Sequence, residues 1–218
     1  IETVSVGSFP AQWQAQAIAD DGSHFAVLLD GQSQGEVKWS QLGVHNMHNA
    51  LSEISAARHV GVPVERSLEA LNRFSGVKRR LEVRGEVNGV TVYDDFAHHP
   101  TAIASTLAGL RRRGNGGRLL AILEPRSNTM RLGIHRHQLA ASLSDADAVW
   151  IYQPEDLSWD VHEVTASLMS PSFVSGNLDE LVASIVAQAR AGDKLVVMSN
   201  GGFGGIHEKL LAALDNAA

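Results

Sequence analysis

Side chains that could carry out chemistry gather in four short segments of this sequence. The first, Asp94–His99, places two carboxylates and two imidazoles directly before Pro100. A carboxylate there could accept hydrogen bonds from two hydroxyls of a ligand, or it could join an imidazole in binding a metal ion. In the alternative, Asp94 or Asp95 caps a turn while the histidines face solvent. A complete metal site needs at least three ligands, and this segment alone does not show how they would converge.

The second segment follows the apolar run Leu119–Leu123 and is rich in side chains that form hydrogen bonds, among them Arg126, Ser127 and Asn128. A guanidinium group can form two parallel hydrogen bonds with one carboxylate, so Arg126 could bind an acidic ligand. The alternative is an ordinary surface loop, because loops are commonly polar.

The third segment lies between the last apolar run and the last helical pattern. It contains Ser199, Asn200, Gly201, Gly202, Gly204 and Gly205. Glycines let the backbone approach a ligand closely, and the following helix N-terminus supplies amide donors and a dipole that favours an anion. The pattern is neither the dinucleotide fingerprint nor a phosphate loop, so it fits a tight connection equally well.

The fourth segment leads into a long helix and contains His45, Asn46 and Asn49. Asparagines three residues apart on a helix point to the same side, where an amide can pair with the edge of a base. In the alternative, Asn46 is a plain N-cap. The remaining histidines, His135 and His207 among them, show no partner spacing and are interpreted as surface or ordinary packed residues. Lys78, Arg79, Arg80 and Arg84 form a basic cluster that still needs an explanation.

Length and composition indicate an ordinary folded protein. The 218 residues are 44% hydrophobic and 19% charged, and the absence of cysteine excludes disulfides, thiolate metal sites and cysteine nucleophiles. The formal net charge of −6 argues against a protein whose main role is to coat nucleic acid. No apolar run is long enough for a membrane-spanning helix, and the first residues lack the pattern of a secretion signal. We therefore expect a cytoplasmic protein with neither nucleic acid nor membrane as its partner.

The elements that position these segments fall into two parts, residues 1–80 and residues 81–218. Over the first forty residues, short apolar runs alternate with Asp-Gly turns, which predicts antiparallel strands. From Asn46 the apolar residues recur with helical spacing until Gly61, and Pro63 opens a second helix.

From residue 81 the pattern predicts a hairpin and then alternating helices and strands. Helices are expected from Pro100, around 138–143, near Trp159, over 178–189 and from 206; strands are expected over 119–123, 148–152, near Phe173 and over 194–199. Runs of Val, Ile and Leu between helices predict an α/β fold with a mostly parallel sheet and helices on both faces. Ligands bind such sheets beyond the carboxyl ends of the strands, where the first three segments lie.

Taken in order, these segments resemble the Mur ligase family, the ATP-dependent amide-forming enzymes of bacterial peptidoglycan synthesis. The resemblance rests on GVHNMHNA, RRLEVRGEVNGVTVYDDFAHHPTA, LEPRSNTMRLG and SNGGFGGIHEKLL, and it covers nearly the whole chain. Within the family the segments are most similar to the member that acts in peptidoglycan recycling. That member joins UDP-N-acetylmuramate to the murein tripeptide L-alanyl-γ-D-glutamyl-meso-diaminopimelate.

The resemblance implies an enzyme of three domains, for the UDP-sugar, for ATP and for the incoming amine. Residues 1–80 would be the strand and helix end of the central ATPase domain, and residues 81–218 would be the C-terminal Rossmann-like domain. The chain departs from the family because it lacks the phosphate-loop pattern GxxGK[ST]. The part that cradles the ATP phosphates and holds most Mg²⁺ ligands is thus expected outside these residues. The chain is expected to be a fragment that does not ligate by itself.

Carried over residue by residue, the resemblance implies two groups of contacts and leaves no residue assigned as catalytic or as a metal ligand. ATP would be bound by His45, Asn46 and Asn49 near the adenine and by Arg80 and Asp95 near the ribose and phosphates. The peptide would be bound by His98, His99, Arg126, Ser127, Asn128, Asn200, Gly201, Gly202, Gly204 and Gly205.

The chemistry that the resemblance implies is amide formation through an acyl phosphate. ATP would phosphorylate the muramate carboxylate, and the free α-amine of the tripeptide would then attack and release phosphate, while the C-terminal domain holds the peptide in line. The residues alone leave two other classes open. One is a metal-dependent phosphoesterase that uses Asp94, Asp95, His98 and His99, and the other is a non-catalytic nucleotide- or peptide-binding module. The order of the motifs is what favours the ligase.

Overall fold

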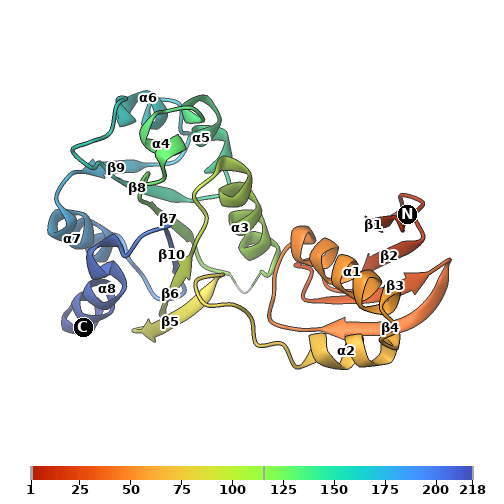
Figure 1. Ribbon diagram of the computed structural model, residues 1–218. Helices are drawn as coiled ribbons and strands as arrows, with labels where there is room; N and C mark the ends of the chain where they lie inside the picture. Colours follow the sequence, from red (N-terminus) through yellow and green to blue (C-terminus); the bar gives the residue numbers. More distant parts are fainter. Residues whose placement is uncertain (1, 115, 218) are drawn as a thin grey trace. The chain divides into compact units, whose positions relative to one another are not determined.

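The computed structural model describes residues 2–114 and 116–217, and the chain forms two compact units (Figure 1). The first unit consists of Ile1–Gly76 and Ala108–Gly114, and the second of Val77–Leu107 and Asn115–Ala218. Helix α3 (Pro100–Arg112) runs from the second unit into the first. Within the described residues, no helix is both long and apolar enough to cross a lipid bilayer.

The first unit is a four-stranded sheet covered by two helices. Its elements are β1 (Val4–Val6), β2 (Trp13–Ala17), β3 (His24–Leu29), β4 (Gln32–Lys38), α1 (Val44–His59) and α2 (Val64–Asn72), with the strands in the order β1-β2-β3-β4. Trp13 and Ala15 alternate with glutamines on β2, Phe25 and Val27 are likewise two positions apart on β3, and all four are fully buried. They pack against the apolar face of α1, so the period-two and helical patterns meet in one core.

The prediction of antiparallel opening strands is correct for β2, β3 and β4 but wrong for β1, which pairs with β2 in parallel. The Asp-Gly turns lie before β3 and before β4, and the connection from β1 to β2 contains none. Gly7 instead adopts φ 87°, and its amide donates to the carbonyl of Ala15. This left-handed conformation, which glycine tolerates, accompanies the parallel arrangement.

Helix α1 begins at Val44, earlier than the predicted start at Asn46. Gly43 is the N-cap residue, so the alternative of Asn46 as N-cap is wrong. The side-chain amide of Asn46 donates to the carbonyl of Leu42 at 2.8 Å from within the first turn.

The second unit is a six-stranded sheet in the order β5-β6-β10-β7-β8-β9, in which only the hairpin strand β5 is antiparallel to its neighbour. Its strands are β5 (Glu82–Val87), β6 (Val90–Asp95), β7 (Leu119–Leu123), β8 (Ala148–Tyr152), β9 (Ser172–Ser175) and β10 (Lys194–Met198). Its further helices are α4 (Asn128–Arg131), α5 (Arg136–Ser142), α6 (Val161–Thr165), α7 (Leu178–Gln188), the short 3₁₀ helix η1 (Phe203–Gly205) and α8 (Ile206–Asn216). The predicted α/β fold with a mostly parallel sheet is confirmed.

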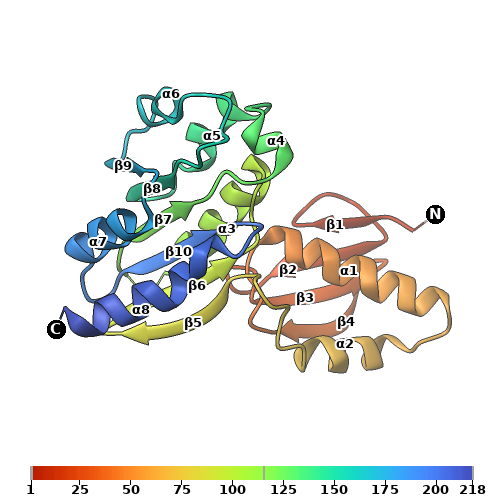
Figure 2. The ribbon, with the colours of Figure 1, turned by 60° about the vertical axis from the view of Figure 1, so that its left-hand side comes forward.

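Helices cover both faces of this sheet because the chain reverses direction once across it. From β6 the chain steps through β7, β8 and β9, and it then returns through α7 to β10, between β6 and β7. Right-handed crossovers therefore place α7 on the face opposite α3 and α5, and Figures 1 and 2 show α7 and α8 together on that opposite face. Every residue of β7 and β10 is buried, which explains their continuous apolar runs.

The carboxyl ends of β6, β10 and β7 lie side by side, because Met198 of β10 pairs with Asp95 of β6 and with Leu123 of β7. The chain leaves β6 toward α3 on one face and leaves β10 toward α8 on the other (Figure 2). This edge is the topological switch point of the sheet, the place where open α/β sheets bind ligands. The structure puts the first three chemical segments here.

The amino ends of β7 and β10 are joined by an ion pair between the partly exposed Arg118 and the buried Asp193. The guanidinium of Arg118 donates to both carboxylate oxygens of Asp193, at 3.1 and 2.6 Å, and the amide of Arg190 donates to the same carboxylate. Burial alone would raise the pKa of the Asp193 carboxyl, but these hydrogen bonds outweigh burial and the pKa lies below its ordinary value.

We predict that Asp193→Asn lowers the free energy of unfolding by about 2 kcal/mol at pH 7. The folded pKa of Asp193 is depressed, so its ionised form stabilises the folded state above the ordinary aspartate pKa of about 3.9, and this contribution is lost as the pH falls through the folded pKa. Urea denaturation at several pH values should show the full difference between wild type and variant at pH 7 and a shrinking difference below about pH 4.

Asp156→Asn is the matched control, because Asp156 also pairs with an arginine, Arg131, but is 57% exposed. Its effect should stay below about 0.5 kcal/mol. A difference for Asp193→Asn that stays constant from pH 7 to acid would show that the ionised carboxylate is not the stabilising species.

Candidate functional site

Three loops form the carboxyl edge of the six-stranded sheet, and we name them by their residues. The histidine loop is Phe96–His99 after β6, the arginine loop is Glu124–Asn128 after β7, and the glycine loop is Ser199–Gly205 after β10. Because β10 lies between β6 and β7, the glycine loop starts between the other two.

A buried serine and a buried glutamate join the glycine loop to the arginine loop. The hydroxyl of Ser199 donates to the carboxylate of Glu124, and the same oxygen accepts a hydrogen bond from the amide of Gly201 at 2.9 Å. Both side chains are buried, so this contact fixes the start of the two loops where water cannot compete.

The exposed side chain of Arg126 lies directly against Gly201. A methyl group added at Gly201 would lie 2.1 Å from Nη1 and 2.6 Å from Cδ of Arg126, closer than atoms can approach. Only glycine therefore fits at position 201 with Arg126 in this place. The glycine loop supports the guanidinium by packing, and the exposed remainder of the group can meet a ligand carboxylate.

The far end of the glycine loop is anchored in the core. Phe203 is buried and contacts Tyr152, with ring centroids 5.7 Å apart. Gly204 has φ 56° and packs so closely on Leu178 that an added methyl group would lie 2.6 Å from a Leu178 methyl carbon. The loop is thus held at both ends, and glycine is required at position 204 for both conformation and space.

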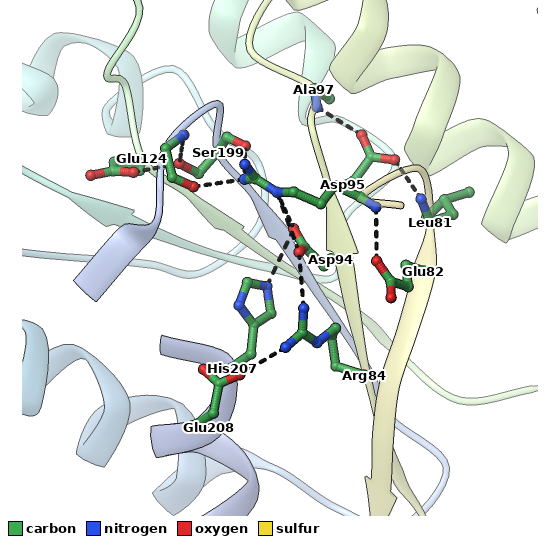
Figure 3. A network of polar contacts seen from close by, with 12 residues as sticks. Leu81, Glu82, Arg84, Asp94, Asp95, Ala97, Glu124, Ser199, His207 and Glu208 are labelled. Atoms are coloured by element: carbon green, nitrogen blue, oxygen red, sulfur yellow. Dashed lines mark hydrogen bonds and ion pairs between the residues drawn. The ribbon is translucent and has the colours of Figure 1, made fainter. Parts of the chain in front are cut away.

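Beneath the glycine loop, Asp94 is buried among three basic side chains (Figure 3). The Arg79 Nε lies 3.4 Å from the carboxylate, Arg84 Nη1 lies 3.6 Å away, and His207 Nε2 lies 3.4 Å away without hydrogen-bond geometry. Burial lowers the pKa of His207 below its ordinary value even though the Asp94 carboxylate opposes this effect. Arg84 also donates to Glu208 at 2.8 Å, so charges of both signs alternate through this cluster.

The Asp95 carboxylate is directed at backbone amides (Figure 3). It accepts from the amides of Leu81 and Ala97, each at 2.8 Å, and from the hydroxyl of Thr106 at 3.3 Å. Burial raises the pKa of the Asp95 carboxyl above its ordinary value, while these hydrogen bonds oppose the rise. Asp95 thus caps the turn after β6, as the alternative interpretation of this segment holds, and a direct contact of Asp95 with a nucleotide stays a prediction.

His98 and His99 are both partly exposed and use the same ring nitrogen in opposite ways. The Nδ1 of His98 lies 2.8 Å from the carbonyl of Phe96 and so carries a proton, whereas the Nδ1 of His99 accepts from the amide of Thr101 at 3.3 Å. In their neutral forms His98 therefore presents an acceptor at Nε2 and His99 presents a donor. His99 also packs edge-on against His135, with ring centroids 4.4 Å apart.

The polar residues of the arginine loop begin a short helix. Ser127 is the N-cap residue of α4, and its Oγ accepts from the amide of Met130 at 3.3 Å. Asn128 is the first helical residue and is exposed. Ser127 therefore uses its hydroxyl oxygen in the helix cap, and the amide of Asn128 faces solvent.

The remaining candidates precede the three loops in the chain. In α1 of the first unit, His45 and Asn49 are exposed, and the side-chain amide of Asn49 donates to Oδ1 of Asn46 at 3.4 Å. This contact places the two asparagines on one side of the helix, as their spacing predicts. In the second unit, Arg80 is exposed, and its guanidinium lies 5.6 Å from the ring centroid of Phe96.

No three histidine, aspartate or glutamate side chains of the described ranges, 2–114 and 116–217, converge in a group that could hold a metal ion. Asp94 faces arginines, Asp95 faces amides, and the two histidines bond to nearby backbone groups. The geometry therefore gives no support to the metal-dependent phosphoesterase.

Comparison with known proteins identifies the family. The family model for the Mur ligase, glutamate ligase domain, matches residues 79–201, which is more than half of the chain. The chain belongs to the Mur ligase family. The matched residues include the histidine loop, the arginine loop and the start of the glycine loop.

Two relatives carry the same name, UDP-N-acetylmuramate–L-alanyl-γ-D-glutamyl-meso-2,6-diaminoheptandioate ligase. The one from Haemophilus influenzae is 51% identical over 98% of this chain and 49% of its own length, and the one from Escherichia coli K12 is 55% identical over 94% and 45%. A solved murein peptide ligase from Psychrobacter arcticus is 44% identical and matches with a TM-score of 0.73 over 98% of this chain and 46% of its own. The chain thus spans about half the length of these relatives.

Three residues of this Mur ligase edge were not singled out by the sequence analysis. Arg79 appeared only as one member of a basic cluster, and His135 and His207 were interpreted as surface or ordinary packed histidines. Their partners Ser199, His99 and Asp94 lie 120, 36 and 113 positions away, so local spacing holds no signal for them.

We predict that Gly201→Ala displaces the Arg126 side chain without unfolding the protein, because the clashing atoms belong to a flexible side chain. The free energy of unfolding should fall by less than about 1 kcal/mol. The ¹H–¹⁵N signal of Arg126 Nε, assigned with Arg126→Lys, should shift.

Gly202→Ala is the matched control, because an added methyl group at Gly202 meets no atom within 4 Å. It should leave the Arg126 signal in place. An Arg126 signal that responds to both glycine variants alike would contradict the packing of Arg126 on Gly201.

Proposed function

We propose that the chain is the peptide-binding part, with some of the nucleotide-binding part, of an ATP-dependent ligase that joins UDP-N-acetylmuramate to the tripeptide L-alanyl-γ-D-glutamyl-meso-diaminopimelate. Membership in the Mur ligase family and the names of the two relatives support the reaction class and the substrates. We assign residues 1–80 to the end of the central ATP-binding domain and residues 81–218 to the peptide-binding domain. The compact units follow this assignment except at residues 77–80, which cluster with the second unit, and Ala108–Gly114, which cluster with the first.

The observation that carries the proposal is the exposed guanidinium of Arg126, held on Gly201 at the switch point of the sheet. A murein tripeptide is a zwitterion with several carboxylates and amines. Arg126 suits a carboxylate because its planar group can form two parallel hydrogen bonds. The buried Oδ1 of Asn200 has no hydrogen-bond partner in the described structure, and the Nε2 of neutral His98 is an acceptor, so both suit an ammonium group.

The remaining predicted contacts belong to the same proposal. Ser127, Asn128, His99 and the backbone of Gly202, Gly204 and Gly205 would line the peptide site. For ATP, the exposed amide of Asn49 has the donor and acceptor that an adenine edge needs, with His45 and Asn46 beside it on α1. The exposed guanidinium of Arg80 suits a phosphate, and Asp95 would act by holding the backbone beside it.

In this proposal the chain positions an amine for acyl transfer. A muramate carboxylate oxygen would bond to the γ-phosphorus of ATP as ADP leaves, giving an acyl phosphate. The tripeptide α-nitrogen would then bond to the acyl carbon, the carbon–oxygen bond to phosphate would break, and the nitrogen would lose a proton. Holding the peptide so that this nitrogen faces the acyl carbon converts an encounter in solution into a reaction within one complex.

Magnesium would stabilise the phosphate charge in this reaction, and the described residues contain no group of three or more histidine, aspartate or glutamate side chains that could hold a metal ion. Because the chain spans about half the length of its relatives, we assign most Mg²⁺ ligands, together with the phosphate loop, to another part of the ligase.

We predict saturable binding when the labelled tripeptide is titrated into the 218-residue chain, and a loss of affinity of at least about tenfold in Arg126→Ala. Arg66→Ala is the matched control, because Arg66 is also exposed but lies on α2 and pairs only locally with Glu69. In the complete ligase, Arg126→Ala should raise the KM for the tripeptide far more than the KM for ATP. Equal effects on both constants would move Arg126 out of the peptide site.

We also predict that the purified chain does not form the amide from UDP-N-acetylmuramate, tripeptide and ATP, because its sequence contains no phosphate loop. The measurement is the release of ADP together with the amide product. If the purified chain formed the amide with no other protein present, the assignment of the chain as only a part of the ligase would be refuted. If the full-length protein bound the peptide but formed no amide, the alternative of a non-catalytic binding module would be favoured instead.

A further inference from the structure

Arg79 contacts the glycine loop from a distant part of the chain. Its Nη2 donates to the carbonyls of Ser199 and Gly201, each at 2.7 Å, while its Nε faces Asp94 at 3.4 Å. One planar guanidinium therefore joins the end of β6 to two carbonyls separated by a single residue. Because the donors of a guanidinium are fixed relative to one another, this contact sets the spacing of the two carbonyls.

Gly201 is in contact with two arginines at once. Its carbonyl accepts from Arg79, and its α-carbon lies against Arg126, where no side chain fits. A rotation of the Gly201 peptide that broke the hydrogen bond from Arg79 would also move the surface on which Arg126 packs. The two arginines are thus mechanically connected through one residue.

The backbone of Arg79 is itself held firmly. Its amide donates to the Glu82 carboxylate at 2.8 Å, and its carbonyl accepts from the amide of Phe96 at 2.8 Å. Its φ of 60° is uncommon for a residue with a side chain, and the surrounding contacts maintain it. The Arg79 guanidinium also lies 5.2 Å from the Phe96 ring centroid, so the arginine contacts the histidine loop as well.

We propose that Arg79 is a positioning residue for the peptide site: it holds the glycine loop in the conformation in which Gly201 supports Arg126. This inference rests on the proposed function, in which Arg126 binds a peptide carboxylate. Arg79 itself faces Asp94 and the loop carbonyls, so it acts on the peptide through Gly201 and Arg126.

Arg84 separates this role from simple neutralisation of Asp94. Arg84 also faces Asp94, at 3.6 Å, but its other partner is Glu208 on α8 and not the glycine loop. A lysine in place of either arginine keeps a positive charge near Asp94. Only at position 79 would the substitution affect the loop carbonyls. Arg79 contacts them through Nη2 while its Nε faces Asp94, and the single nitrogen of a lysine ammonium cannot occupy both positions.

The test compares Arg79→Lys with Arg84→Lys in the 218-residue chain. Arg79→Lys should weaken tripeptide binding at least about tenfold, which corresponds to loss of charge-assisted hydrogen bonds, and Arg84→Lys should change it less than about twofold. Hydrogen–deuterium exchange of the amides of residues 199–205 should become faster in Arg79→Lys and stay as in wild type in Arg84→Lys. Both variants should keep the wild-type circular dichroism and a cooperative unfolding transition.

The possible outcomes separate this inference from the proposed function. If wild type binds the tripeptide and Arg79→Lys binds it equally well, the positioning role is overturned while the proposed function stands. If wild type does not bind, the proposed function fails, and the exchange rates decide whether Arg79 orders the loop. Unchanged exchange in Arg79→Lys overturns the inference in either case, as does equal loosening of the loop by Arg84→Lys.

Should Arg79→Lys fail to fold, Gly201→Ala provides the second variant. It keeps the carbonyl that Arg79 contacts but displaces Arg126, so it should weaken tripeptide binding as Arg126→Ala does while leaving the exchange rates of Ser199 and Asn200 near wild type. Faster exchange at these two residues in Gly201→Ala would show that the hydrogen bonds from Arg79 do not by themselves hold the loop, and would overturn the inference.

Discussion

Buried polar groups at the carboxyl ends of β6, β10 and β7 constrain the rest of this edge of the sheet. A buried donor or acceptor without a partner destabilises the fold by about 1–3 kcal/mol, and the strands end here, so their ladder supplies no further partners. Side chains from other parts of the chain supply them. Arg79 meets the carbonyls of Ser199 and Gly201, and Asp95 meets the amides of Leu81 and Ala97.

This constraint divides the polar residues of the edge into two layers. The inner layer, which includes Asp94, Asp95, Glu124 and Ser199, is buried and hydrogen-bonded within the protein. The outer layer contains the partly or fully exposed side chains of Arg80, Arg126, His98 and His99. A ligand at this edge would meet the outer layer, while the inner layer determines where the outer groups stand. Residues that look alike in the sequence can differ in this respect: Arg79 is partly exposed and donates to the glycine loop, whereas Arg80 is exposed.

The sequence predicts what depends on local pattern. The buried strands β7, β8 and β10 and the helices α7 and α8 follow from apolar runs and helical periodicity, and the place of Asp94, Arg126 and Asn200 follows from the rule for parallel sheets. The parallel pairing of β1 was not predicted, because strand direction depends on a connection that carries no turn signal. Ser127 as a helix cap was also missed, since a four-residue helix is too short for periodicity to reveal. The partners of Arg79 and His207 depend on tertiary contacts over more than a hundred residues, for which a single sequence gives no signal.

The packing of Arg126 on Gly201 also bears on the conformational entropy of recognition. A free arginine side chain samples many rotamers, and confining it opposes binding by up to about 2 kcal/mol. Here the Arg126 side chain packs on the backbone of Gly201, a contact that disfavours rotamers pointing away from it. In the proposed peptide site, part of the loss of rotational freedom would therefore accompany folding, and a carboxylate would meet a group that is already partly ordered. In that site, the absence of a side chain at Gly201 would thus contribute to the affinity of Arg126 for a carboxylate.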